Sequence, residues 1–188
     1  LALTANSSGT DNTAVGYAAG DAVTTGSDNT LIGDNAGGAL TTGANNVAVG
    51  SSALLTEDGN GNNVAVGFES LKVLNAGAEG YNTAVGYQAG VALTTGVQNT
   101  IVGGLAGDAL TTGNYNTGVG VHAIGSTTTA ASNTAIGYNA LYANTTGASN
   151  TAVGRNSLDA NTTASNNTAI GYDALTANTT GANNVAVG

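Results

Sequence analysis

The sequence predicts an all-β fold, a parallel β-solenoid (β-roll) of about eleven 17-residue coils with two short strands in each coil. The first observation is a five-residue phrase, Asn-Thr-Ala-Val-Gly at 12–16, which returns in eleven copies up to the last residue. The second is a constant interval of 17 residues between copies, apart from one interval of 19 residues between Asn63 and Asn82. The third is that each interval holds two β-type segments and two glycine turns, which leaves no room for a helix. We therefore expect residues one period apart to stack about 4.8 Å above one another.

The first predicted strand covers the start of each coil, whose positions we number from its asparagine. Position 4 is Val or Ile in every copy, position 2 is Thr or Val, and position 3 is usually Ala. Alternation with β-branched residues on one face is typical of a short strand. We predict that position 4 forms a core ladder of Val15, Ile32, Val49, Val66, Val85, Val102, Val119, Ile136, Val153, Ile170 and Val187. On the opposite face, Ala with Leu31 and Ile101 among it would form a flat strip that another sheet could approach.

A glycine ends each of these strands at position 5, where a turn with positive φ is expected. These turn glycines are Gly16, Gly33, Gly50, Gly67, Gly86, Gly103, Gly120, Gly137, Gly154, Gly171 and Gly188. A second strand is predicted at positions 11–14, as in 39–42, and usually ends in Gly at position 15.

Position 1 is asparagine in every copy, and stacked side-chain amides can hydrogen-bond from coil to coil. We predict a structural ladder rather than a row of ligand-binding amides. Its members are Asn12, Asn29, Asn46, Asn63, Asn82, Asn99, Asn116, Asn133, Asn150, Asn167 and Asn184.

A large side chain alternates between positions 9 and 12. Where position 9 is Gly, position 12 is Leu or Val, as in Gly37 and Leu40; where position 9 is Leu, position 12 is commonly Asn, as in Leu158 and Asn161. Because close packing penalises both empty and overfilled space, we infer that each coil generally has one slot for a large side chain.

The composition excludes several functional classes. The 188 residues carry a net charge of −9, with Lys72 and Arg155 as the two basic residues, which argues against nucleic acid and anionic membrane surfaces as partners. No apolar run is long enough for membrane insertion. The absence of Cys excludes a disulfide scaffold and a thiolate metal site. We expect residues 1–188 to be a single repeat array, a window of a longer repetitive chain, because it starts and stops inside a repeat.

No catalytic, cofactor-binding or metal-binding residues are predicted. His122 occupies a variable turn without a repeating acid or nucleophile, and general-base catalysis needs an oriented partner. The acidic residues lie mainly on turns without the spacing of a calcium-binding roll, and no phosphate-binding loop with Lys is present. Possible surface contacts are the position-6 rings Tyr17, Tyr87, Tyr138 and Tyr172, which could stack on sugars.

Pairs of threonine recur at positions 13 and 14, as in 24–25 and 111–112. One Thr of each pair should point outward and form a file along the solenoid. Flat arrays of Thr are displayed by ice-binding solenoids, whereas the β-propensity of Thr gives a purely structural interpretation.

The phrases Asn-Thr-Ala-Val-Gly and Asn-Asn-Val-Ala-Val-Gly, with a following Ala and a later Gly, resemble the head repeats of YadA-like trimeric autotransporter adhesins and those of phage tail fibres. The resemblance covers the whole chain, although the repeat of this chain is longer than that of the adhesin heads. It implies a left-handed parallel β-roll, three chains side by side, and binding to host or matrix surfaces.

The sequence and the resemblance together predict a non-enzymatic structural module of an extracellular fibre or filament, the shaft or head of a cell-surface adhesin or phage tail fibre. Its expected partners are copies of itself, as a homo-oligomer (by resemblance a homotrimer) and by end-to-end continuation, with a host-surface or glycan ligand as a further expectation. Two alternatives remain: an ice-binding solenoid that uses its Thr files, and a glycan-binding module that uses its Tyr rows.

Overall fold

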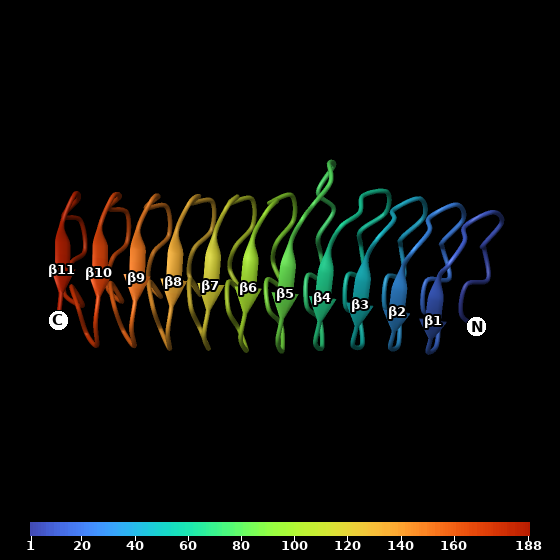
Figure 1. The fold of residues 1–188 in the computed structure, drawn as a ribbon, viewed down its shortest axis with the longest axis horizontal. Coiled ribbons are helices and arrows are strands. Elements are labelled where there is room, and N and C mark those ends of the chain that lie inside the picture. The colour runs from blue at the N-terminus through green and yellow to red at the C-terminus, as the bar shows by residue number, and fades with distance from the viewer.

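The computed structural model describes all residues from 1 to 188 and contains one parallel β-sheet and no helix. Eleven three-residue strands follow one another in sequence order, and each pairs with the next (Figure 1). The strands are β1 (Thr13–Val15), β2 (Thr30–Ile32), β3 (Val47–Val49), β4 (Val64–Val66), β5 (Thr83–Val85), β6 (Thr100–Val102), β7 (Thr117–Val119), β8 (Thr134–Ile136), β9 (Thr151–Val153), β10 (Thr168–Ile170) and β11 (Val185–Val187). The predicted parallel β-solenoid is therefore confirmed, and the left-handed winding implied by the resemblance stays a prediction.

The strand register follows the sequence repeat. Val15 pairs with Ile32, and Ile32 pairs with Val49, so equivalent residues stack directly. The 19-residue coil keeps this register, since Val66 of β4 pairs with Val85 of β5. Its loop at 75–80 projects beyond the outline of the other coils, between β4 and β5 (Figure 1). The two additional residues are thus absorbed outside the sheet.

The second strand predicted in each coil is not a strand. Residues 39–42 form a turn and a bend. The amide of Leu40 donates to the carbonyl of Gly37 in its own coil, at 3.1 Å, so it is not available to the next coil. Coil-to-coil pairing persists beside this turn, where the Thr24 amide donates to the Thr41 carbonyl at 2.9 Å. The coil therefore has one strand, followed by turns that still hydrogen-bond to the neighbouring coil.

The prediction of a Val and Ile core was wrong, because the two faces of the strand are interchanged. Val15 is 59% exposed and Ile136 is 41% exposed, whereas Ala84 is completely buried. Leu31 and Ile101, predicted on an outward strip, are also completely buried. The position-4 residues, all of them exposed or half-buried, are Val15, Ile32, Val49, Val66, Val85, Val102, Val119, Ile136, Val153, Ile170 and Val187.

The narrow cross-section of a 17-residue coil explains this arrangement. The buried core consists mainly of Ala at positions 3 and 8 and of larger side chains at positions 9 and 12, such as Leu158 and Leu40. Small Ala side chains let the strand approach the opposite turns closely. The β-branched residues lie outside, where they still favour the extended backbone. Leu71 and Leu74 are both buried in the 19-residue coil, and the 17-residue coil of Leu31 and Leu40 also buries two large side chains.

The position-5 glycines have the positive φ that the sequence predicts, between 127° and 142°. At Gly103 a Cβ would lie 2.5 Å from the carbonyl oxygen of Gly120 in the next coil. Because that oxygen belongs to the backbone, only glycine fits both the dihedral angle and the space.

Candidate functional surface

The position-1 asparagines lie inside the solenoid and link successive coils. At Asn116 the backbone amide and the side-chain Nδ2 donate to Asn99 Oδ1 at 2.9 Å and 3.2 Å, and Nδ2 also donates to the Ala130 carbonyl at 2.9 Å. Asn116 Oδ1 in turn accepts from the amide of Asn133 at 3.1 Å. From Asn29 to Asn167 these side chains are buried, so they are not available to a ligand. The asparagine ladder is structural.

A second, shorter asparagine ladder was missed by the sequence analysis. Asn161 Nδ2 donates to Asn144 Oδ1 at 3.0 Å, and Asn178 Nδ2 donates to Asn161 Oδ1 at 3.2 Å. Each Nδ2 also donates to a carbonyl three residues later, as from Asn144 to Gly147 at 2.9 Å. Three successive Asn residues at position 12 were the available signal, because they share one stacked position.

The two residues of a threonine pair have different roles: the first hydrogen-bonds to the backbone of the next coil, and the second is exposed. Thr111 Oγ1 at position 13 donates to the Thr128 carbonyl in the next coil at 3.0 Å, and Thr24 Oγ1 donates to the Thr41 carbonyl at 3.2 Å. The second Thr of each pair is exposed at position 14, as at Thr112. A file of outward Thr therefore runs along one turn face.

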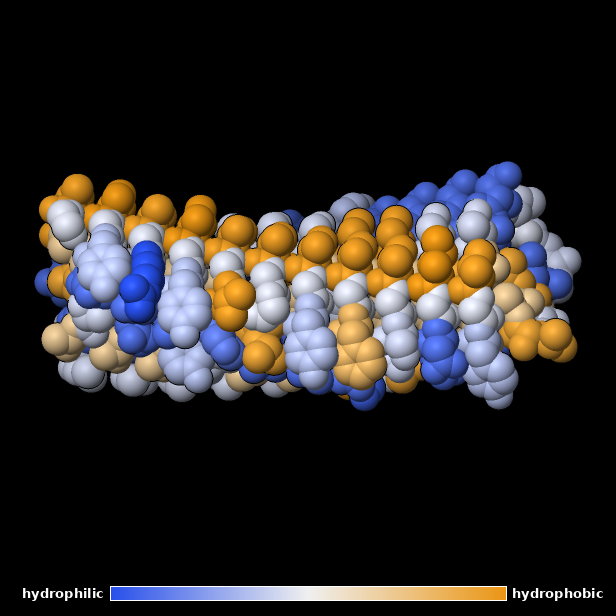
Figure 2. Space-filling model, turned by 90° about the horizontal axis from the view of Figure 1, so that it is seen from below, coloured by the Kyte–Doolittle hydropathy of each residue, from blue (hydrophilic) through white to orange (hydrophobic).

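The outer surface of the sheet carries a second periodic pattern, which we call the strand face: the side chains at positions 2 and 4 of the eleven coils. Position 4 contributes Val or Ile throughout, and position 2 contributes Thr except at Val47, Val64 and Val185. No charged residue occurs in either file. Figure 2 shows an apolar file along the length of the rod, with a row of larger side chains beside it.

That adjacent row lies at position 6 and contains the four predicted contact tyrosines, all of them exposed. Tyr87 stacks on Phe68, with ring centroids 5.6 Å apart and planes 10° apart. The Cζ of Arg155 lies 5.8 Å from the ring centroid of Tyr138 and 5.5 Å from that of Tyr172. Phe68 and Tyr87 therefore contact each other face to face, whereas Tyr138 and Tyr172 each contact the guanidinium of Arg155. Tyr17, 72% exposed, is the most accessible ring of the row.

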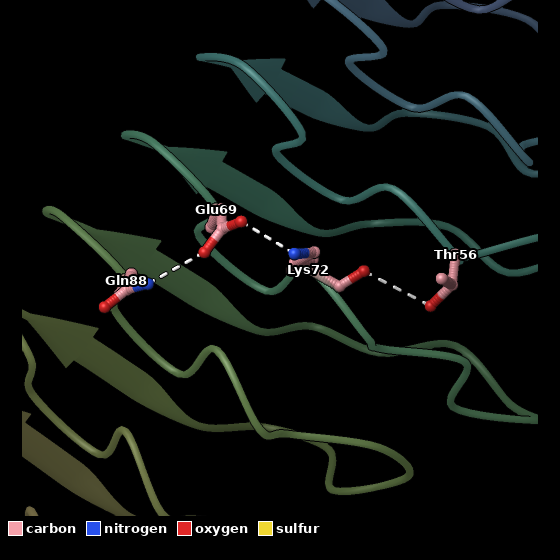
Figure 3. Close-up of polar contacts among 4 residues, drawn as sticks. All are labelled: Thr56, Glu69, Lys72 and Gln88. Atoms are coloured by element: carbon pink, nitrogen blue, oxygen red, sulfur yellow. Dashed lines mark hydrogen bonds and ion pairs between the residues drawn. The ribbon is translucent and has the colours of Figure 1, made fainter.

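The charged side chains lie on the turns. Lys72 Nζ lies 2.6 Å from Glu69 Oε1, and Gln88 Nε2 donates to Glu69 Oε2 at 2.8 Å (Figure 3). Hydrogen bonds from Lys72 and Gln88 lower the pKa of Glu69. Burial raises the pKa of Asp159, and the nearby Asp173 carboxylate raises it further.

Glu57 is an exception among the charged residues, because it is completely buried at position 12. Its Oε1 accepts from the amide and the Nδ2 of Asn60 at 3.1 Å and 3.0 Å, and its Oε2 accepts from the Ala76 amide at 3.3 Å. These bonds link Glu57 to its own turn and to the 19-residue coil. The side chain thus satisfies backbone groups beside the projecting loop, a role that the repeat pattern did not indicate.

His122 is half-buried and packs edge-on against Tyr142, with ring centroids 5.8 Å apart. No group of three or more His, Cys, Asp or Glu side chains could hold a metal ion, and no pocket indents the surface. The candidate interaction surfaces are therefore the periodic rows: the strand face, the position-6 row and the file of exposed Thr at position 14.

The structure contains no helix of the length and hydrophobicity needed to span a membrane. No protein-family model matches the chain, and neither a curated protein nor a solved structure is significantly similar to it.

Proposed function

We propose that this chain is a structural module of an extracellular fibre or filament, forming the shaft or head of a surface adhesin or phage tail fibre, and that it has no enzymatic role. The observation that carries the proposal is the continuity of the hydrogen-bonded ladders from β1 to β11. Adjacent coils are joined by strand pairs, and further bonds come from the buried asparagines. A rod held together in this way resists bending and separation of its coils, because many bonds must break together.

The surface supports the same interpretation. Eleven coils at about 4.8 Å give a rod about 50 Å long. Its acidic turns, with a net charge of −9 for the chain, favour solubility of an exposed filament. A stiff spacer acts by its length and rigidity, so it needs neither a pocket nor a titrating cluster.

Electron microscopy of the purified chain tests this proposal. Thin, straight particles of uniform width, at least as long as one eleven-coil rod, are expected. Compact particles, or chains that bend freely within one molecule, would overturn it.

Ice binding is the second candidate, and one observation favours it: exposed Thr side chains repeat at the coil spacing at position 14, and exposed or half-buried Thr side chains repeat at position 2. Thr112 belongs to the file at position 14, and Thr100 belongs to the file at position 2. Measurement of thermal hysteresis tests this role. A freezing-point gap that disappears in Thr112→Lys, with the circular dichroism spectrum unchanged, would favour ice binding over a spacer role.

A further inference from the structure

The strand face carries no charge over eleven coils: its position-4 file is apolar in every coil, and its position-2 file is Thr apart from Val47, Val64 and Val185. Position-4 side chains in the middle of the sheet retain appreciable exposure, as the 41% of Ile136 shows, although they pack against their neighbours in the file. A strip eleven coils long and about 12 Å wide covers roughly 600 Å². Within this strip the position-4 file forms a continuous apolar row, and the Thr side chains of position 2 add methyl groups beside it. Contiguous apolar surface on a soluble protein marks sites of association.

The regular spacing of the face selects its partner. Ile32, Val49 and Val66 repeat at the spacing of paired parallel strands. A partner whose side chains repeat at another distance would lose register over eleven coils. Some of its side chains would then collide with those of the strand face instead of packing between them. A second copy of this chain has the same spacing and the same β-branched side chains, and each file can fit between the side chains of the other.

We propose that the strand face is the lateral interface between copies of this chain, which associate side by side with their position-4 files in a shared core. This inference rests on the proposed fibre function and specifies which face builds the fibre. Two faces of roughly 600 Å² bury about 1,200 Å² in total, the lower limit of a standard specific interface. The position-6 rings border this core, where aromatic residues are enriched in interfaces.

The charge distribution makes the interface sensitive to salt. Each copy carries a net charge of −9 on its turns, so neighbouring copies repel one another while their uncharged faces attract. Added salt screens the repulsion and leaves the apolar contact intact. Association should therefore become tighter as the salt concentration rises, opposite to the behaviour of an interface held by ion pairs.

Sedimentation velocity of the full chain, combined with matched variants, tests the interface. Val102→Glu with Val119→Glu places two charges in the strand face, and Thr112→Glu with Thr129→Glu places two charges on the exposed turn face of the same two coils. The parent chain should sediment as an oligomer whose mass is two or three chains. The dissociation constant of the oligomer should rise at least about tenfold in the strand-face variant. The turn-face variant should keep the oligomeric mass of the parent, and its added charge should change the dissociation constant only slightly.

Circular dichroism separates dissociation from unfolding. If the Glu variant unfolds, Val102→Thr with Val119→Thr keeps a β-branched shape and should still weaken the oligomer. A parent chain that is monomeric at about 100 µM, or two Glu variants that dissociate equally, would overturn the interface. Two combined outcomes separate the proposals. Straight single rods in the microscope together with a monomeric mass would refute the interface and leave the fibre proposal standing. An oligomer of compact particles would refute the fibre proposal alone.

Discussion

The side chain of Leu31 occupies the space beside Gly37 in which another side chain would otherwise lie. A Cβ built on Gly37 would come within 2.7 Å of Leu31 Cδ2. The coil of Ala152 and Leu158 has the reverse arrangement, with the small residue on the strand and the large one at position 9. Position 3 therefore takes part in the volume exchange that the sequence indicated only for positions 9 and 12.

Leu31→Ala should lower the free energy of unfolding by about 2–4 kcal/mol, because it leaves a cavity in a completely buried site. Adding Gly37→Leu should recover at least about 1 kcal/mol by returning a large side chain to the same space. Urea unfolding of both variants and of Gly37→Leu alone measures this coupling. Additive effects of the two changes would contradict the shared-slot account.

Gly103 and Gly104 are neighbours in the chain, but only Gly103 lacks space for a side chain. Gly103→Ala should destabilise the chain by about 2 kcal/mol or more, since its φ is +136° and the new Cβ would meet the Gly120 carbonyl. Gly104→Ala should be neutral or slightly stabilising, because no atom lies within 4 Å of its Cβ position. Thermal melting compares the two, and equal shifts would show that the coil-to-coil contact at position 5 is not tight.

Asn116→Ala should lower the free energy of unfolding by about 2–4 kcal/mol, because it leaves the Ala130 carbonyl and the Asn133 amide without their buried partner. Thr112→Ala on the exposed turn face is the control and should change stability by less than about 0.5 kcal/mol. Chemical denaturation of the two proteins measures the difference. A small effect at Asn116 would mean that the ladder is not a main source of cohesion between coils.

The sequence predicted the period, the register and the turn glycines because each depends on spacing or on one backbone angle. It predicted the alternation of the strand but assigned the core to the wrong face, since Val15 and its equivalents are more hydrophobic than Ala and Asn. The expectation that the more hydrophobic face is buried fails here, because the buried Asn amides hydrogen-bond to groups in the next coil. Those partners cannot be recognised within a single repeat. The contact between Gly37 and Leu31, and the burial of Glu57, likewise depend on three-dimensional proximity across a coil.

Asp159 should make stability depend on pH. Burial and Asp173 raise its pKa above the ordinary value of 3.8, so ionisation costs the folded state more than the unfolded state. Stability is therefore lower above the raised pKa and is regained as the pH falls through it. Asp159→Asn should raise the melting temperature near pH 7, and the gain should disappear below about pH 3.8, where the parent carboxyl is protonated in both states.

The same substitution at the exposed Asp11 is the control for Asp159→Asn. It should give a smaller gain at neutral pH. A gain at Asp159 that persists unchanged in acid would show that the carboxylate charge is not its cause.

Distances between spin labels test the stacked coils most directly, because the chain has no Cys of its own. Labels on Thr42→Cys and Thr112→Cys are four coils apart, and labels on Thr42→Cys and Thr163→Cys are seven coils apart, all on the exposed turn face. Pulsed electron spin resonance should give separations of about 19 Å and about 34 Å, in proportion to the number of coils. Separations that do not grow with coil number, or broad distributions extending far beyond these values, would contradict the solenoid.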